Sequence, residues 1–400
     1  MIKEGFYTVT TRVIVLILGV ILSVVLNRMM GPEGKGIYTG VIVFVQTAGM
    51  LFFWGYDVVF SMLTGKRNIR AGIVSGTLFF IFLIISTVFT LIIFVSKPVI
   101  ERVLVGFPLN ISTIPMIGFL FFSELWLRAL PDGFLGRGDV RGFNLFNLFN
   151  SLIKLVVIGL SVFLFFGSPE GGILGYSIYA YIILVFSLFI FRPDGFNIRL
   201  VLKEVKHIGI WVFLSDLFAF LLYRFDFLLL NGLKGSYSLG IYSTAVYMCE
   251  VIWLVPVSFN NVIYARVVTN RKMPEKRDFL ITFISVVFSG IIGCIFIKPV
   301  VLFLYGEEFL PVVGIFRLLL PGIVFFSIPK VLNAIVVGKY ERPAIITTTV
   351  VSSFLLNLFL DLFFIPRLGM TGAAIGTSIS YTTGAIIYMF LFRRLKKWEG

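Results

Sequence analysis

The chain has little charge, two cysteines and a single histidine. Asp, Glu, Lys and Arg make up only 14% of its 400 residues, whereas a soluble domain carries about 25% charged residues. Cys249 and Cys294 lie inside apolar runs, so we expect small buried side chains and neither a disulfide nor a metal site. His207 has no acid–base partner evident in the sequence, and no metal-ligand spacing, phosphate-binding glycine loop or Ser-His-Asp arrangement is present. These shortages exclude a soluble domain and argue against an enzyme.

Apolar residues dominate instead, at 58% of the chain. A helix needs about 20 mostly apolar residues to cross a membrane, and such stretches fill nearly the whole sequence. The sequence therefore predicts an all-α polytopic membrane protein of twelve transmembrane helices. Their expected ranges are 8–30, 37–63, 72–96, 113–134, 143–166, 172–192, 208–231, 237–265, 279–304, 312–337, 344–365 and 370–392.

The distribution of Lys and Arg predicts the orientation. The side that holds both termini collects 21 of these residues in the connections, and the opposite side collects 7. Because cytoplasmic loops carry the excess of positive charge, we expect both termini in the cytoplasm and the chain in the cell membrane. The net charge of +14 is thus topological information and does not indicate nucleic acid. The run that ends near Met30 has no small-residue cleavage pattern, so we expect a retained first helix.

Two sets of matches indicate an internal duplication. The turn residues Asn27, Gly31, Gly36, Ile37 and Tyr38 recur at Asn231, Gly235, Gly240, Ile241 and Tyr242, an offset of 204. Gly171, Gly175, Ser177 and Ile178 recur at Gly372, Gly376, Ser378 and Ile379, an offset of 201. Since six helices separate equivalent positions, the two halves have the same orientation in the membrane. The sequence predicts two parallel six-helix lobes, 1–196 and 210–400, the second with a short basic tail.

The predicted linker between the lobes covers residues 197–209. Ile198, Val201, Leu202 and Val205 share one helical face, and Arg199, Lys203 and Lys206 share another. This is the pattern of a short interfacial amphipathic helix that lies on anionic lipid. A second reading is that its cations also gather an anionic lipid head group.

Ionisable side chains inside spanning segments mark candidate functional sites, because each costs several kcal/mol in the bilayer. The tally of six basic and six acidic residues does not set the sign of a cavity. Arg12, Asp57, Arg317, Lys330 and Asp361 lie within about two turns of a helix end, and each is more readily explained by a structural role. The substrate-binding candidates are Arg12, Arg128, Lys154 and Arg224, and the ion-coupling or charge-pair candidates are Asp57, Glu124, Asp216, Asp226 and Glu250.

Lys154 is the first choice for a cation that faces a cavity, because it lies mid-helix; the alternative is a salt bridge. Glu124 and Arg128 are spaced i,i+4 and can pair on one helix face. Arg224 and Asp226 point about 200° apart around a helix, so one needs a partner elsewhere, for which Glu250 is available.

The duplicated six-helix unit, the basic linker and the segment from Leu26 to Tyr38 resemble the polysaccharide-biosynthesis flippases, the O-antigen translocase type. That family belongs to the superfamily that also holds the lipid II flippase and the MATE drug exporters. Arg224-Phe225-Asp226, the run from Gly240 to Ala245 and Pro256 resemble the opening of the family's second lobe. The resemblance covers essentially the whole chain.

The resemblance implies a flippase that moves an undecaprenyl-pyrophosphate-linked saccharide from the inner to the outer leaflet by alternating access. It implies cavity-facing candidates Arg12, Asp216, Arg224 and Glu250, a set that omits Lys154. No resident cofactor or metal is expected, and three modes of driving transport stay open: coupling to H⁺, coupling to Na⁺, or removal of the substrate alone. The expected partners are the lipid-linked saccharide, membrane lipid and a polysaccharide polymerase or other proteins of lipopolysaccharide assembly.

Two alternatives remain open. A MATE-like exporter of organic cations, driven by Na⁺ or H⁺, would need an acidic cavity in which Asp57, Asp216, Glu250 or a similar carboxylate titrates. A membrane enzyme of polysaccharide assembly is disfavoured, because every outer loop is short and His207 is expected on the cytoplasmic side.

Overall fold

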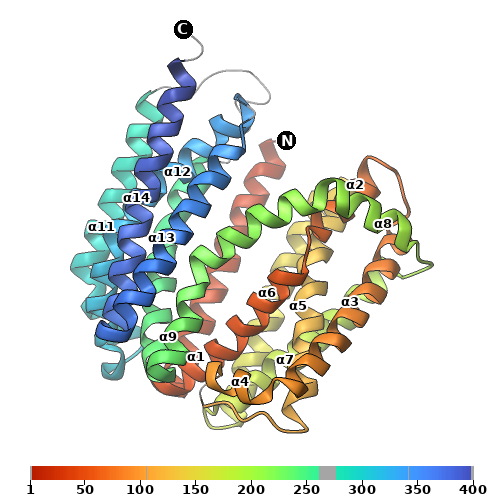
Figure 1. Ribbon diagram of the computed structural model, residues 1–400, viewed down its shortest axis with the longest axis horizontal. Helices are drawn as coiled ribbons and strands as arrows, with labels where there is room; N and C mark the ends of the chain where they lie inside the picture. Colours follow the sequence, from red (N-terminus) through yellow and green to blue (C-terminus); the bar gives the residue numbers. More distant parts are fainter. Residues whose placement is uncertain (1, 105, 261–275, 341, 398–400) are drawn as a thin grey trace. The chain divides into compact units, whose positions relative to one another are not determined.

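The computed structural model describes residues 2–104, 106–260, 276–340 and 342–397. These residues form helices and short connections, and no strand occurs among them (Figure 1). The predicted all-helical class is confirmed. The end of the predicted helix 237–265 and the loop cations Arg266, Arg271 and Lys272 lie outside the described residues.

The chain divides into two compact units, Met1–Phe220 and Leu221–Gly400, which are described separately here as unit 1 and unit 2. The boundary falls inside α9 (Ile210–Glu250), so unit 1 includes the segment predicted as a linker. Unit 1 further contains α1 (Ile2–Phe52), α2 (Tyr56–Gly65), α3 (Ala71–Val95), α4 (Lys97–Val103), α5 (Thr113–Gly136), α6 (Val140–Leu164), α7 (Pro169–Phe191), α8 (Ile198–Glu204) and η1 (Val205–Gly209). Unit 2 further contains η2 (Val251–Trp253), α11 (Lys276–Leu304), η3 (Glu307–Phe309), α12 (Pro311–Gly338), α13 (Ala344–Leu368) and α14 (Met370–Lys397).

Nine helices of the described residues are long and apolar enough to cross a membrane, or ten if the bent pair 198–209 and 212–260 is one span. Two of the long helices, α1 and α9, are each two helices merged across a kink. Dividing both at their kinks gives a helix for each of the twelve predicted ranges in the described residues, but the range 37–63 is interrupted at residues 53–55, between α1 and α2. The short helix α4, between the third and fourth spans, was not predicted.

The kinks fall at Gly31 and Gly235, which are equivalent positions of the predicted repeat. Their backbones match, with φ 65° and ψ −179° at Gly31 and φ 80° and ψ 174° at Gly235. Almost only glycine adopts this conformation. The prediction of glycine-rich turns over 31–36 and 235–240 is wrong in extent, because a single residue breaks each helix and Pro32 can start the next one.

Helix α5 is central in unit 1 and buries a large part of its surface. Trp126 and Phe121 on this helix are almost completely buried, and the Trp126 indole donates to Ser187 Oγ on α7 at 2.7 Å. The caps of the next two helices fix their ends, since Asp139 accepts from the Gly142 N–H at 2.7 Å and Ser168 accepts from Gly171 at 3.0 Å.

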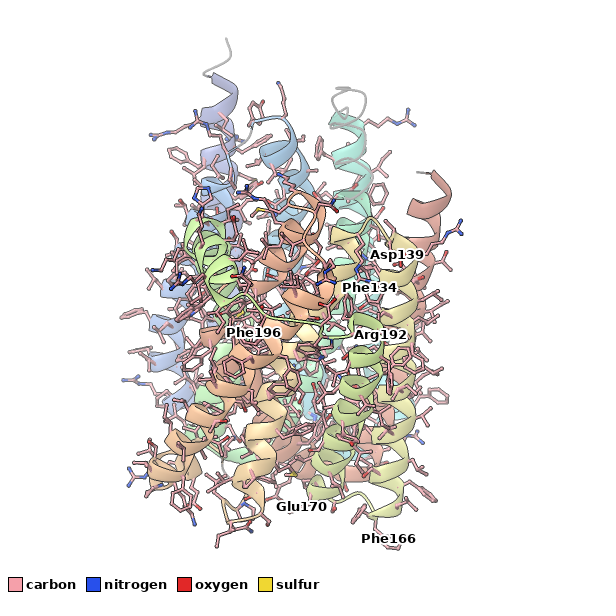
Figure 2. The ribbon with its side chains drawn as sticks, turned by 90° about the vertical axis from the view of Figure 1, so that its right-hand side faces the viewer. Phe134, Asp139, Phe166, Glu170, Arg192 and Phe196 are labelled. Atoms are coloured by element: carbon pink, nitrogen blue, oxygen red, sulfur yellow. The ribbon has the colours of Figure 1, made fainter. Side chains whose placement is uncertain are left out.

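Side chains near the ends of α6 and α7 show that these two successive spans run in opposite directions. Asp139 and Arg192 lie toward one end of this unit, and Phe166 and Glu170 lie at the other (Figure 2). Helix α6 therefore begins at the end of unit 1 where α7 ends.

The connection that leads out of unit 1 is docked on its own unit. Glu204 of α8 is buried and forms a 3.2 Å ion pair with Arg67 after α2. A Cβ atom on Gly55 would lie 2.6 Å from the Gly209 carbonyl oxygen, so the two backbones are in direct contact. The predicted interfacial segment is helical and consists of α8 followed by the short π-helix η1.

Unit 2 is built around α12, α13 and α14, and α14 packs against both of the others (Figure 1). Small residues permit the close approach. A Cβ on Gly322 of α12 would lie 2.6 Å from the Ser378 Cα atom of α14, and one on Gly384 would lie 2.1 Å from Ser353 Oγ of α13. The interior of unit 2 is therefore tightly packed where its polar residues lie.

Candidate functional site

The second set of repeat glycines identifies the same structural position in both units. Gly175 of α7 faces α6, and a Cβ atom there would lie 2.7 Å from Ser161 Cβ. Its repeat partner Gly376 of α14 faces α13, where a Cβ atom would lie 2.7 Å from Asp361 Oδ1. The two helix pairs thus pack alike, but unit 2 has a carboxylate where unit 1 has a serine.

Unit 1 places two lysines and one glutamate in its interior. Lys35 is only 5% exposed, and Lys154 and Glu124 are half-buried. Lys154 interacts electrostatically with both Lys35 and Glu124. These three side chains, defined here as the lysine cluster, come from α1, α6 and α5. With two cations and one anion, the cluster has an excess of one positive charge.

Aromatic rings surround these lysines. Lys154 Nζ lies 5.2 Å from the ring centre of Tyr176 and 5.9 Å from that of Tyr179, and Lys35 Nζ lies 5.2 Å from that of Tyr38. Tyr179 donates to Asn150 Oδ1 at 2.6 Å. Cation–π contacts stabilise an ammonium group without neutralising it. The cluster can therefore attract an anion, and no ion pair within 4.0 Å involves Lys154 in the described part of the chain.

Unit 2 places two buried carboxylates at its interior. Asp226 of α9 is 2% exposed and Asp361 of α13 is 1% exposed. The Tyr242 hydroxyl donates to Asp226 Oδ2 at 2.5 Å and lies 3.1 Å from Thr377 Oγ1, which is 3.4 Å from the same carboxylate oxygen. Asp226 and Asp361 interact electrostatically. We define Asp226, Asp361, Tyr242, Thr377 and Asn357 as the carboxylate cluster.

Among the residues that the structure describes, two atoms of the carboxylate cluster find no hydrogen-bond partner. They are Asp361 Oδ1 and Asn357 Nδ2, whose side chains are spaced i,i+4 on α13 and are each 1% exposed. A buried polar group left unsatisfied costs about 1–3 kcal/mol. Two adjacent buried carboxylates also repel when both are ionised. The unpaired carboxylate oxygen and this repulsion favour occupation by a proton or a small hard cation, for which carboxylate and hydroxyl oxygens are suitable ligands. Asn357 Nδ2 is a hydrogen-bond donor and would need an acceptor, not a cation.

The repeat explains why only unit 2 has this cluster. The residues of unit 1 equivalent to Asp226, Tyr242 and Thr377 are Leu22, Tyr38 and Tyr176. Two of these, Tyr38 and Tyr176, are the rings that contact Lys35 and Lys154. The equivalent tyrosines Tyr38 and Tyr242 therefore contact a lysine in unit 1 and a carboxylate in unit 2, although Lys35 itself corresponds to Leu239 in the repeat. In the described residues no group of three or more His, Cys, Asp or Glu side chains is arranged for a metal ion.

Arg224 is neutralised by Glu250, the partner that the sequence offers. The two guanidinium nitrogens donate to the two carboxylate oxygens at 2.8 and 2.9 Å. The side chains are only 17% and 21% exposed. This bidentate geometry indicates a structural bridge between the two halves of α9.

Replacing Arg224 with Ala is therefore expected to destabilise the protein by about 3 kcal/mol, because Glu250 would be left as an unpaired buried charge. Thermal unfolding of the purified protein in detergent measures the loss. The double variant Arg224→Ala/Glu250→Ala should recover most of it. If the single and double variants unfold alike, the ion pair is not what Arg224 contributes.

The remaining predicted residues of unit 1 are arranged differently from expectation. Arg128 does not form an ion pair within 4.0 Å with Glu124 in the described structure; it donates to Met50 Sδ and lies 5.3 Å from the ring centre of Phe53. It still interacts electrostatically with Glu124, and it also interacts with Asp57 and with Asp216, which is exposed. Arg12 is exposed on α1.

Lys35, Lys330 and Asp361 are the residues whose surroundings the sequence missed. Lys35 falls between the expected helices 8–30 and 37–63 and was therefore counted among the 7 cations of the outer connections, but the helix resumes directly after Gly31, so Lys35 lies buried within α1. Lys330 is not directed to a helix end, because its Nζ lies 3.9 Å from the Trp253 ring centre and donates to the Tyr223 hydroxyl at 3.1 Å. The i,i+4 spacing of Asn357 and Asp361 was the available signal for the carboxylate cluster.

Comparisons with known proteins agree with this architecture. The family described as "Polysaccharide biosynthesis protein" matches residues 1–268. A "Putative O-antigen transporter" of Shigella flexneri is 23% identical in an alignment that is 399 residues long with its gaps and that covers 92% of this chain and 92% of that one.

Solved structures show the same fold. A lipid II flippase, MurJ, in an inward closed conformation superposes with a TM-score of 0.74 at 17% identity, covering 98% of this chain and 88% of that one. An inward-facing MATE-family multidrug resistance transporter superposes with a TM-score of 0.70 at 15% identity, covering 95% and 94%.

Proposed function

The chain belongs to the polysaccharide biosynthesis protein family, and we propose that it is a flippase that carries a lipid-linked saccharide across the cell membrane. Its relatives are membrane transporters and not enzymes. The proposed substrate is an undecaprenyl-pyrophosphate-linked saccharide, which moves from the inner to the outer leaflet by alternating access. Both termini are proposed to lie in the cytoplasm, in keeping with the distribution of Lys and Arg.

The lysine cluster of unit 1 is the observation that carries this proposal. A pyrophosphate group bears about two negative charges at neutral pH and cannot enter hydrocarbon without fixed cations to receive it. Lys35 and Lys154 supply two such charges, of which Glu124 balances one. The surrounding tyrosine rings are also suitable surfaces for sugar rings.

The carboxylate cluster of unit 2 is proposed to bind the coupling ion, H⁺ or Na⁺. An ion that enters there would neutralise Asp226 and Asp361 and satisfy Asp361 Oδ1. Binding of the ion changes the charge inside unit 2. It shifts the conformational equilibrium only if the ion binds one conformation of the protein more tightly than the other.

Complementation distinguishes the flippase from an exporter. A strain that lacks its own flippase for a lipid-linked saccharide should regain surface glycan when it expresses this chain. Without the chain, the same strain should accumulate the carrier-linked saccharide inside the cell. Expression in the membrane is verified in parallel. Absence of surface glycan despite normal membrane expression would contradict the proposal.

The carboxylate cluster and the MATE-like fold favour a second candidate, an ion-coupled exporter of organic cations. This candidate predicts efflux of a fluorescent organic cation that varies with external pH or Na⁺. Efflux without glycan export would favour the exporter, and glycan export without efflux would favour the flippase.

A further inference from the structure

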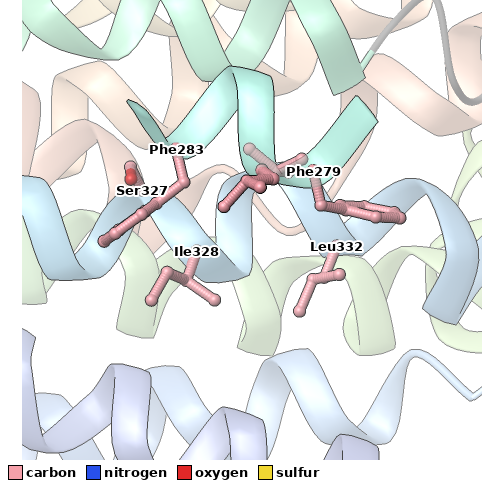
Figure 3. A pocket seen from close by; sticks show the side chains of 7 residues that line it. Phe279, Phe283, Ser327, Ile328 and Leu332 are labelled. Carbon is pink, nitrogen blue, oxygen red and sulfur yellow. The ribbon is translucent and has the colours of Figure 1, made fainter. Parts of the chain in front are cut away.

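A groove with almost entirely apolar walls lies between α11 and α12 of unit 2. It has a volume of about 300 Å³. Phe279 and Phe283 of α11 lie opposite Ile328 and Leu332 of α12 (Figure 3). Leu280 also lines it and is 59% exposed, so the groove is open to the outside of this unit.

The groove exists because the two helices touch farther along their length. A Cβ on Gly290 of α11 would lie 3.2 Å from Val324, and one on Gly293 would lie 3.2 Å from the Phe316 ring. Toward the start of α11 no glycine interrupts the bulky residues, and α12 contains Pro329 in its groove-lining segment. Proline distorts a helix by removing one backbone hydrogen bond. The helices are close at the two glycines and leave a gap beyond them.

The lining offers a ligand almost no polar group. Ser327 is the single polar residue of the lining, and its hydroxyl donates to the Val324 carbonyl at 2.6 Å. A ligand of this groove is therefore hydrocarbon.

The groove ends near basic residues of both helices. Arg277 lies two residues before Phe279, and Lys339 and Arg342 follow the end of α12. At a rise of about 1.5 Å per residue, Lys339 lies about 10 Å beyond Leu332 along the helix direction. Arg277 and Arg342 are exposed. This combination suits a lipid whose anionic head lies at the helix ends and whose chain lies in the groove.

We propose that this groove binds the polyprenyl chain of the lipid-linked saccharide on the loading side of the membrane. The inference rests on the proposed function, which supplies a lipid with a phosphate head and a long methyl-branched chain. The predicted orientation places Arg277 and Arg342 in the cytoplasm, where such a substrate arrives. The chain would remain in the groove while the charged head group is transferred.

Site-specific photocrosslinking tests the groove with a matched control on the same helix. A photoreactive phenylalanine replaces Leu280 in the groove or Ile281, which is 43% exposed and about 100° away around α11. The full-length protein is reconstituted in vesicles of phosphatidylglycerol and phosphatidylethanolamine with a trace of radiolabelled C55 polyprenyl phosphate. We expect several-fold more label at position 280 than at 281, and competition by unlabelled polyprenyl phosphate but not by added phosphatidylglycerol.

Equal labelling at both positions, or competition by phosphatidylglycerol alone, would show that ordinary acyl chains fill the groove and would overturn the inference. In that outcome the same protein can still restore surface glycan, so the proposed function stands. Preferential labelling at position 280 without glycan export would support the groove as a binding site for the polyprenyl chain but would contradict the proposed function. Leu280→Trp should reduce glycan export several-fold relative to Ile281→Trp at equal membrane expression, and equal export by both would also contradict the inference.

Discussion

Asp361→Asn should reduce glycan export to less than about a tenth of the wild-type level, because a change of 1.4 kcal/mol in ion binding is already tenfold. Asn keeps the size of the side chain but removes the charge that attracts H⁺ or Na⁺. Asp226→Asn should act similarly, since both carboxylates belong to one buried pair. Export of surface glycan is measured while the external pH and the Na⁺ concentration are varied.

The matched control is Glu308→Gln, which makes the same chemical change at an exposed residue of η3 and should leave export unchanged. Thermal unfolding separates loss of coupling from loss of folding. We expect Asp361→Asn to be at least as stable as the wild type, because a buried charge is removed. Wild-type export with an unchanged response to pH and Na⁺ would show that the carboxylate cluster does not couple transport.

Lys154→Met should lower export about 10- to 100-fold, because a hydrogen bond between charged groups contributes about 1.5–3 kcal/mol. Met retains the length and apolar stem of lysine, so packing against Tyr176 and Tyr179 is largely kept. The excess positive charge of the lysine cluster is lost. Lys154→Arg should retain more activity than Lys154→Met. Initial rates of export at equal membrane expression provide the measurement.

A second substitution tests whether charge is the cause. Lys154→Met/Glu124→Gln also removes the negative charge of the cluster and so restores an excess of one positive charge, and export should partly recover. Lys298→Met removes an exposed lysine and serves as the control. Recovery would not follow if Lys154 were only a packing residue, and a fully active Lys154→Met variant would exclude the cluster as the anion site.

The spans themselves could be predicted closely from the sequence. Long apolar runs define α3, α5, α6 and α7 to within a few residues, because burial of twenty consecutive apolar residues leaves few alternatives. The repeat was predictable from its glycines, whose equivalent backbone angles are now seen at Gly31 and Gly235. The sequence was therefore sufficient to predict the structure where the backbone conformation requires one residue type, as it requires glycine at these kinks.

The candidate site was less predictable, because its residues meet across helices. Lys154 was selected for its depth alone, but its charged neighbour Lys35 comes from a segment read as a loop. Asp361 lies near a helix end, so capping was the simpler interpretation until its contact with Gly376 showed its direction. Arg224 is conspicuous in sequence, and its pairing with Glu250 leaves it less available than Lys154.

The two units share their helix packing but differ in the charged residues of their interiors. Gly175 and Gly376 keep the same helix packing in each half. On that common framework, unit 1 has Lys35 and Lys154 and unit 2 has Asp226 and Asp361. One half is thus suited to an anionic substrate and the other to a cation.

Transport by the purified protein is the most direct test of the account. The full-length chain is reconstituted in vesicles with a fluorescent saccharide linked to C55 polyprenyl pyrophosphate, and an impermeant reagent quenches molecules that reach the outer leaflet. The account predicts quenching beyond the half that is initially exposed, dependent on the protein, accelerated by a H⁺ or Na⁺ gradient and lost in Lys154→Met. Quenching that stops at the same level as in protein-free vesicles would contradict it.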